Sequence, residues 1–301
     1  MDRIYYAKRG SYRSVANRFF SREQLIKWLL VVSAFSSLLF LFIIFAFILG
    51  EGLPLFYKVG VSKIIFGFTW APTKGFFGIF PMIVSSYMVT LGALIFGAPL
   101  ALGCATYLSE YASRKMKMFL KPALELLAGI PSVVYGFLGV VYIVPLIREY
   151  LGGPGFSILA TSVVLGIMIL PTIISISFDS LMSVPPTYRE ASVAMGATKW
   201  QTIYNVVLPA ARSGILASFI LGMGRAVGET MAVIMVAGNA LHIPMSLLDP
   251  LRTLTSNIAL ELAYAAGDHR SALFSTGVVL LLIIMILNFV ANFWVKRKVA
   301  G

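Results

Sequence analysis

The 301-residue sequence predicts an all-α polytopic membrane protein with about six transmembrane helices. Two features of the composition support this fold class: 59% of the residues are apolar and only 12% are charged, whereas soluble domains carry roughly a quarter charged residues. The third feature is the length of the apolar runs, because a membrane-spanning helix needs about 20 mainly apolar residues. These features exclude a soluble globular domain.

Five apolar runs are long enough to cross a bilayer and contain no charge. They are residues 29–49, 76–109, 126–147, 151–178 and 271–295. A sixth run, roughly 208–236, contains two ionisable residues, Arg225 and Glu229. Six spans place both termini on the same side of the membrane.

The distribution of lysine and arginine predicts that this side is the cytoplasm, because basic residues near span ends favour it. Most of them lie in segments 3–27, 114–121, 189–212 and 296–298. Fewer lie on the opposite side: Lys58, Lys63, Lys74, Arg148, Arg252 and Arg270. This bias, together with anionic lipid headgroups, accounts for the net charge of +12 without nucleic acid as a partner.

Three regions follow from these patterns. Residues 1–24 form a basic cytoplasmic tail, residues 25–50 the first transmembrane helix, and residues 76–295 a core with five further spans. The first run shows no small-x-small cleavage pattern, so it is expected to remain as an anchor rather than a signal peptide. Cys104 is the only cysteine, which excludes an internal disulfide.

The sequence contains no phosphate-binding loop, zinc-protease motif or nucleophile-elbow motif. We therefore expect a transport subunit rather than an enzyme, with no cofactor of its own. If ATP drives transport, a separate subunit must bind the ATP and Mg. His242 and His269 are too few for a metal site and are expected to be solvated loop residues.

The cytoplasmic loop at 183–209 contains two predicted helix starts. Thr187 with Glu190 and Thr198 with Gln201 both have capping-box spacing. Gly196 between them can adopt the left-handed conformation that ends a helix. The pattern predicts two short helices with apolar residues available to a partner's groove: Tyr188, Val193, Met195 and Trp200. The alternative is a well-capped connector with no partner.

Arg225 and Glu229 lie four residues apart in the predicted fifth span, where ionisable residues are costly. One interpretation is a self-neutralised structural pair within the helix. The other is that Arg225 offers a permanent positive charge to an anion in transit, with Glu229 orienting it. Glycines at 222, 224 and 228 leave one side of this helix without bulk.

The loop residues Glu190-Ala191, Gly196 and Leu208-Pro209 resemble the "EAA" loop of ABC-importer permeases. In that superfamily a short coupling helix in this loop inserts into the ATPase subunit. The resemblance implies the type I ABC importer permease fold. It also implies that Glu190, Ala191, Gly196, Leu208 and Pro209 couple the chain to an ATPase.

The run Arg-Ala-Val-Gly-Glu-Thr-Met at 225–231 resembles the phosphate-importer (Pst) permeases, and segments 78–82, 125–136 and 238–259 are similar to the same family. The last of these segments, with Ala272-Leu-Phe after it, most resembles the PstC-type subunit. The resemblance implies that Arg225, Glu229 and Thr230 line the path. Sulfate and molybdate permeases share the Arg and Glu, so this pair cannot itself select phosphate. An importer of either anion, a secondary transporter and a membrane scaffold remain alternatives.

The same resemblance implies partners and a location. The partners are a homologous PstA-type permease, two ATPase subunits, an extracytoplasmic phosphate-binding protein and membrane lipids. The location is the plasma membrane of a bacterium or archaeon. Within the core, Gly129-Ile-Pro131 and Leu170-Pro171 predict either helix interruptions or simple proline kinks packed by neighbouring helices. Glu125 is expected at the cytoplasmic start of the third span.

Overall fold

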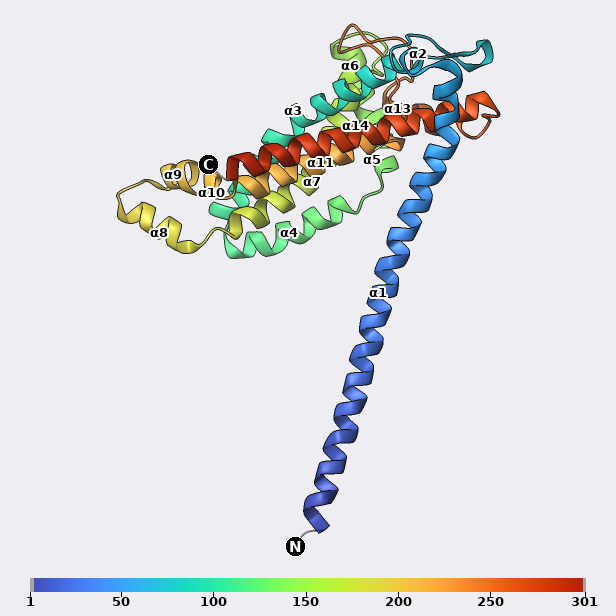
Figure 1. Cartoon of the computed structure of the whole chain (residues 1–301). Coiled ribbons are helices and arrows are strands. Elements are labelled where there is room, and N and C mark those ends of the chain that lie inside the picture. The colour runs from blue at the N-terminus through green and yellow to red at the C-terminus, as the bar shows by residue number, and fades with distance from the viewer. Residues whose placement is uncertain (1–2, 300–301) are drawn as a thin grey trace. The chain divides into compact units, whose positions relative to one another are not determined.

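The computed structural model describes residues 3–299, with side chains described from Gln24 to Val290 (Figure 1). The basic side chains before Gln24, on which the predicted tail at 1–24 depends, lie outside the described residues. The chain divides into two compact units, residues 1–51 and 52–301. Each unit is described by itself.

The first unit consists of most of helix α1 (Arg3–Val59). The part of helix α1 from Gln24 to Val59 is long and apolar enough to cross a membrane. In the first unit most of the large apolar side chains from Leu25 onward are exposed, for example Phe35 and Phe42 at 69% and 70%. Such a surface is favourable in lipid and costly in water, so a bilayer is the environment that this helix requires.

The second unit is a helical bundle with one small β-ribbon. The ribbon and its neighbours comprise α2 (Val61–Ile65), β1 (Trp70–Ala71), the 3-10 turn η1 (Pro72–Lys74) and β2 (Phe76–Phe77). The strands are antiparallel, with Trp70 opposite Phe77. The backbones at Gly67 and Gly78 cross so closely that a Cβ on Gly78 would lie 2.4 Å from the carbonyl carbon of Gly67. Only glycine fits at this crossing.

The remaining elements form the bundle and its two ends. They are α3 (Phe80–Glu110), α4 (Arg114–Ala128), α5 (Ser132–Leu138), the π-helical turn η2 (Gly139–Ile143), α6 (Val144–Tyr150), α7 (Ile158–Met182), α8 (Pro186–Ala194), α9 (Lys199–Thr202), the π-helical turn η3 (Ile203–Val207), α10 (Leu208–Ala210), α11 (Arg212–Gly228), α12 (Met231–Val236), α13 (Leu254–Glu261) and α14 (Asp268–Val299). Helices α8 and α9 lie at one end, and α2, α6 and α13 at the other (Figure 1).

The predicted fold class is confirmed. Among the described residues, five helices are long and apolar enough to cross a membrane: Gln24–Val59, Phe80–Glu110, Ser132–Tyr150, Ile158–Met182 and Asp268–Val290. A sixth span results if the bent pair Lys199–Ala210 and Arg212–Gly228, with 69° between its two helices, counts as one.

Small residues hold the central helices together. Helix α3 packs along α7, and α7 packs along α11. A Cβ on Gly97 of α3 would lie 2.8 Å from the carbonyl oxygen of Gly166 in α7, and one on Gly222 of α11 would lie 2.7 Å from Ile173 in α7. Helices in membranes associate through such close backbone approaches, because the hydrophobic effect does not drive helices together in lipid.

The third span differs from the prediction at its start. The break predicted at Gly129-Ile-Pro131 is confirmed, since α4 ends at Ala128 and α5 begins at Ser132. Glu125 therefore lies in the last turn of α4 and does not begin a span, so that prediction was wrong. The prediction rested on the uncharged run at 126–147, which does not include the basic first part of α4. Helix α4 begins after Ser113, whose hydroxyl accepts a hydrogen bond from Met116 N. At Leu170-Pro171 the interruption is wrong and the alternative of a proline packed within a continuous helix remains, because α7 continues through a buried Pro171.

Candidate translocation path and coupling surface

Arg225 is held against the centre of the bundle by a neighbouring helix. Helix α11 approaches α7 closely, because the hydroxyls of Ser218 and Ser177 lie 2.8 Å apart and Gly222 packs on α7. One turn further on, Arg225 Nη1 donates a hydrogen bond to Thr172 Oγ1 at 3.0 Å. Thr172 is thus the residue that orients this guanidinium. Its hydroxyl uses one of the five N–H donors of Arg225.

The predicted pair of Arg225 with Glu229 is not formed. Helix α11 ends at Gly228, and Glu229 is extended with φ −69° and ψ 134°. Its Oε1 instead accepts a hydrogen bond from Ala232 N at 3.2 Å, at the start of α12. Because an i, i+4 pair requires a continuous helix, the break removes the expected alignment. The prediction that Glu229 orients Arg225 was wrong.

The break itself is stabilised from a distant part of the chain. Thr255 Oγ1, in α13, donates a hydrogen bond to the carbonyl oxygen of Glu229 at 2.8 Å. Thr230 Oγ1 contacts the carbonyl oxygen of Gly228 at 3.3 Å. These bonds satisfy carbonyl groups that the end of α11 leaves without helical partners.

Two of the three glycines beside Arg225 face open space. A Cβ on Gly224 or Gly228 would meet no atom within 4 Å, whereas one on Gly222 would clash with Ile173. The predicted lack of bulk therefore serves two purposes. Gly222 allows close packing on α7, and Gly224 and Gly228 leave room beside a partly buried cation.

A second polar cluster lies at the end of the bundle that contains α13. Glu261 is 8% exposed, and its Oε1 accepts a hydrogen bond from Arg252 Nη1 at 2.6 Å. Its Oε2 contacts Trp70 Nε1 at 2.9 Å and His269 Nε2 at 2.8 Å. The expectation that His269 is a solvated loop residue was wrong, because it belongs to α14 and packs on this carboxylate.

The loop at 183–209 forms the two short helices that its capping residues predict. Gly196 has φ 85° and separates α8 from α9. Thr198 and Gln201 form a complete capping box at the start of α9. The Ser192 and Thr202 hydroxyls, 2.9 Å apart, tie the two helices together.

The capping box predicted at Thr187 and Glu190 is absent. Helix α8 begins at Pro186, with Pro185 at the N-cap and no side-chain cap. Proline suits the first helical position, so Thr187 already lies inside the first turn, where its hydroxyl cannot cap. Glu190 is exposed instead, beside exposed Ala191.

The apolar residues that the sequence offered as contacts are exposed. The exposed fractions are 52% for Tyr188, 59% for Val193, 87% for Met195 and 63% for Trp200. The Trp200 ring stacks on Tyr204 with centroids 6.4 Å apart. An exposed apolar surface on short capped helices is typical of a segment that fits into a partner's groove.

Helix α8 is anchored to the bundle by an ion pair that the sequence did not predict. Arg189 Nη2 lies 2.7 Å from Glu110 Oε1 at the end of α3. The same guanidinium donates hydrogen bonds to the carbonyl oxygens of Val184 at 2.8 Å and Leu181 at 3.0 Å. The Glu110 and Arg189 side chains are 8% and 26% exposed. Helix α8 is therefore fixed to the ends of both α3 and α7.

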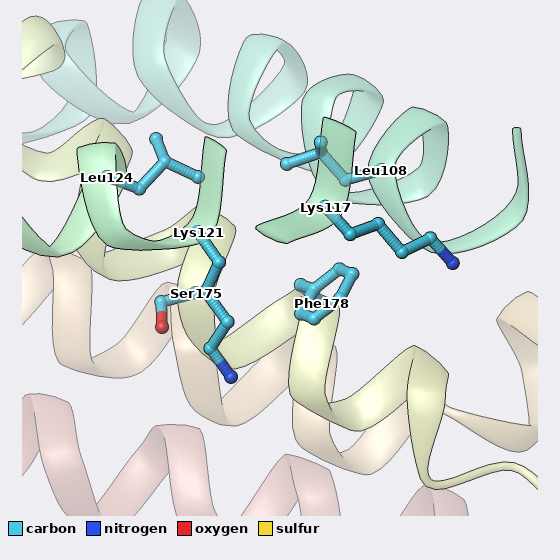
Figure 2. Close-up of a pocket in the computed structure, with 6 residues that line it drawn as sticks. All are labelled: Leu108, Lys117, Lys121, Leu124, Ser175 and Phe178. Carbon is cyan, nitrogen blue, oxygen red and sulfur yellow. The ribbon is translucent and has the colours of Figure 1, made fainter. Parts of the chain in front are cut away.

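Two lysines fix α4 on the same end of the bundle (Figure 2). Lys121 Nζ lies 2.9 Å from Asp179 Oδ1, and Lys117 Nζ donates to the carbonyl oxygen of Ser109 at 2.7 Å. The hydrogen bond with Asp179 raises the pKa of the Lys121 ammonium above its ordinary value. The hollow beneath them is only about 10 Å³, which is too small for a transported solute.

Comparison with known proteins places this geometry in a family. Residues 97–299 match the family described as "Binding-protein-dependent transport system inner membrane component". The chain belongs to this family of transporter permeases. It is 42% identical over 260 residues to the probable ABC transporter permease protein YqgH of Bacillus subtilis, with 83% of each chain covered.

Several relatives of this permease are named for phosphate transport. The phosphate transport system permease protein PstC of Pasteurella multocida is 34% identical, covering 76% of this chain and 78% of its own. The probable phosphate transport system permease protein PstC of Methanocaldococcus jannaschii is 31% identical, covering 85% and 89%. The resemblance to ABC-importer permeases of the phosphate family, of the PstC type, is thereby confirmed.

Solved importer structures share the fold of this permease. A bacterial ABC transporter that imports the polysaccharide alginate has a TM-score of 0.64, with 17% identity, 90% of this chain covered and 96% of that chain. The MetNI methionine ABC transporter has a TM-score of 0.54, with 21% identity, 73% of this chain covered and 94% of that chain. The chain is thus a multi-pass ABC importer permease subunit with the type I fold.

Sequence reasoning found Arg225, the two glycines beside it and the exposed face of α8 and α9. It missed Thr172, Thr255 and the pair of Arg189 with Glu110. These partners lie more than 25 positions away along the chain, so no local pattern connects them.

Proposed function

We propose that this permease forms part of the path for phosphate in an importer driven by a separate ATPase. The observation that carries the proposal is Arg225, a permanent cation fixed by Thr172 inside a membrane-spanning helix and beside the open space at Gly224 and Gly228. An ionisable residue within a membrane span marks a transport path by default. A guanidinium offers a forked set of donors that matches phosphate oxygens.

Glu229 and Thr230 are proposed to line the path with Arg225, at the break between α11 and α12. Glu229 caps α12 through Ala232 N, so its carboxylate does not neutralise Arg225. An anion that reaches the guanidinium therefore meets a charge that no carboxylate pairs with among the described residues. Thr230 lies in the break between α11 and α12, where a change of backbone angle can move the path.

The exposed face of α8 and α9 is proposed as the surface that docks on the ATPase subunit. Glu190 and Ala191 lie on this face, Gly196 shapes its corner, and Leu208 and Pro209 lead into the bend before α11. Movement of α8 reaches α3 and α7 through Arg189. Closure of two ATPase subunits around ATP and Mg would thus rock the spans between inward- and outward-facing arrangements.

The remaining assignments follow from the family. Both termini are proposed to be cytoplasmic, since the basic loops lie at the end with α8 and α9. A homologous PstA-type permease would complete the path, and an extracytoplasmic binding protein would deliver phosphate. The names of the PstC relatives support phosphate as the anion.

The test is phosphate uptake by cells that lack their own high-affinity system and carry this chain with its partner subunits. Arg225→Gln is expected to lower ATP-dependent uptake at least about tenfold, because one charge-assisted contact contributes ~1.5–3 kcal/mol. Arg212→Gln, at the exposed start of the same helix, is the matched control and should retain uptake.

Normal uptake by an assembled Arg225→Gln complex would refute the proposed path. Uptake of sulfate or molybdate but not phosphate would indicate the same kind of ATP-driven importer with another anion as its substrate. Uptake that persists without ATP would instead indicate a secondary transporter.

A further inference from the structure

A hollow of about 580 Å³ lies beside the ribbon at the end of the bundle that contains α2 and α13. Its lining comes from residues between Lys58 and Gly78. These residues connect the end of one candidate span, at Val59, to the start of the next, at Phe80. A segment between two span ends lies at the boundary where the hydrocarbon gives way to headgroups.

The hollow contains hydrogen-bond donors for which the described residues offer no acceptor. Lys63 is exposed and forms no ion pair with any described residue, and the exposed hydroxyls of Ser62 and Thr69 make no hydrogen bonds within the described chain. The other lining lysine, Lys58, already pairs with Asp268. Residues 52–109 contain no aspartate or glutamate, so no carboxylate of this segment neutralises Lys63.

Exposed aromatic rings also line the hollow. Phe66, Phe68 and Phe76 are 63%, 65% and 57% exposed. Phe66 and Phe68 lie against Phe80 at the start of α3, with ring centroids 6.3 and 5.2 Å apart. The hollow thus combines an unpaired cation and two hydroxyls with an apolar rim.

We propose that this hollow binds an anionic phospholipid, with its phosphate at Lys63, Ser62 and Thr69 and its glycerol and upper acyl carbons on the phenylalanine rings. A negative headgroup matches the uncompensated lysine. A free phosphate ion would use the donors but leave the rings exposed. A soluble protein bound in the hollow would not supply the lipid that aromatic rings contact at the membrane boundary. The site is independent of the anion that the permease transports.

The test uses the full-length chain purified in a neutral detergent and native mass spectrometry with added lipid. Phosphatidylglycerol should form a bound adduct at lower concentration than phosphatidylcholine of the same acyl chains. Lys63→Ser should lower the occupancy by phosphatidylglycerol about fivefold, the effect of one lysine beside an anionic lipid. Phe68→Ser should lower the occupancy by both lipids.

Lys74→Ser is the matched control, since Lys74 belongs to the same ribbon but does not line the hollow. It should change the occupancy less than about twofold. Equal binding of both lipids, or equal losses in the two lysine variants, would overturn the proposal. So would an inorganic phosphate adduct that competes with the lipid, or binding of phosphatidylglycerol only after an extracytoplasmic partner protein is added.

Discussion

Replacing Arg189 by methionine tests how α8 is held to the bundle. The change leaves Glu110, whose side chain is 8% exposed, without the cation that contacts both of its oxygens. It also removes the donors to the carbonyl oxygens of Val184 and Leu181. Breaking a fully buried ion pair on one side costs about 3–5 kcal/mol. Because Arg189 is 26% exposed, water can enter, and we expect a loss of about 2–3 kcal/mol.

The loss is measured as the free energy of unfolding of the full chain in detergent, by denaturant titration followed by circular dichroism. Arg212→Met is the control and should change it by less than about 0.5 kcal/mol. Adding Glu110→Gln to Arg189→Met should recover part of the loss, because the uncompensated charge is then gone. A double variant no more stable than Arg189→Met would refute the reasoning, as would a loss below about 0.5 kcal/mol for the single variant.

Two further predictions concern the same end of the bundle. Thr198→Ala should destabilise α9 by about 1 kcal/mol through loss of the helix cap. Thr187→Ala should have little effect, because the Thr187 side chain caps no helix. Hydrogen exchange of the backbone amides in α9 distinguishes the two variants. Asp179→Asn should remove a pH-dependent contribution to stability. Since the folded pKa of Lys121 is raised, this contribution is present below the ordinary pKa of 10.5 and is lost as the pH rises above it. The stabilities of wild type and variant should therefore converge above pH 10.5, and a constant difference through that range would contradict the assignment.

The local chemistry of the chain was sufficient to predict the membrane spans and one helix cap. A spanning helix buries its apolar side chains in lipid, so the run of apolar residues is itself the signal, and it requires no knowledge of tertiary contacts. Thr198, Gln201 and Gly196 act within a few residues of one another. For that reason their capping box and left-handed corner could be predicted from spacing alone.

The partners of the charged residues were decided by the tertiary structure alone. The end of α11 at Gly228 breaks the predicted pair of Arg225 with Glu229, and the break is satisfied by Thr255, 26 positions further along. Arg225 is then oriented by Thr172, 53 positions earlier. A helical spacing rule assumes that the helix continues. Whether it continues depends on hydrogen-bond partners that only the folded bundle brings into reach.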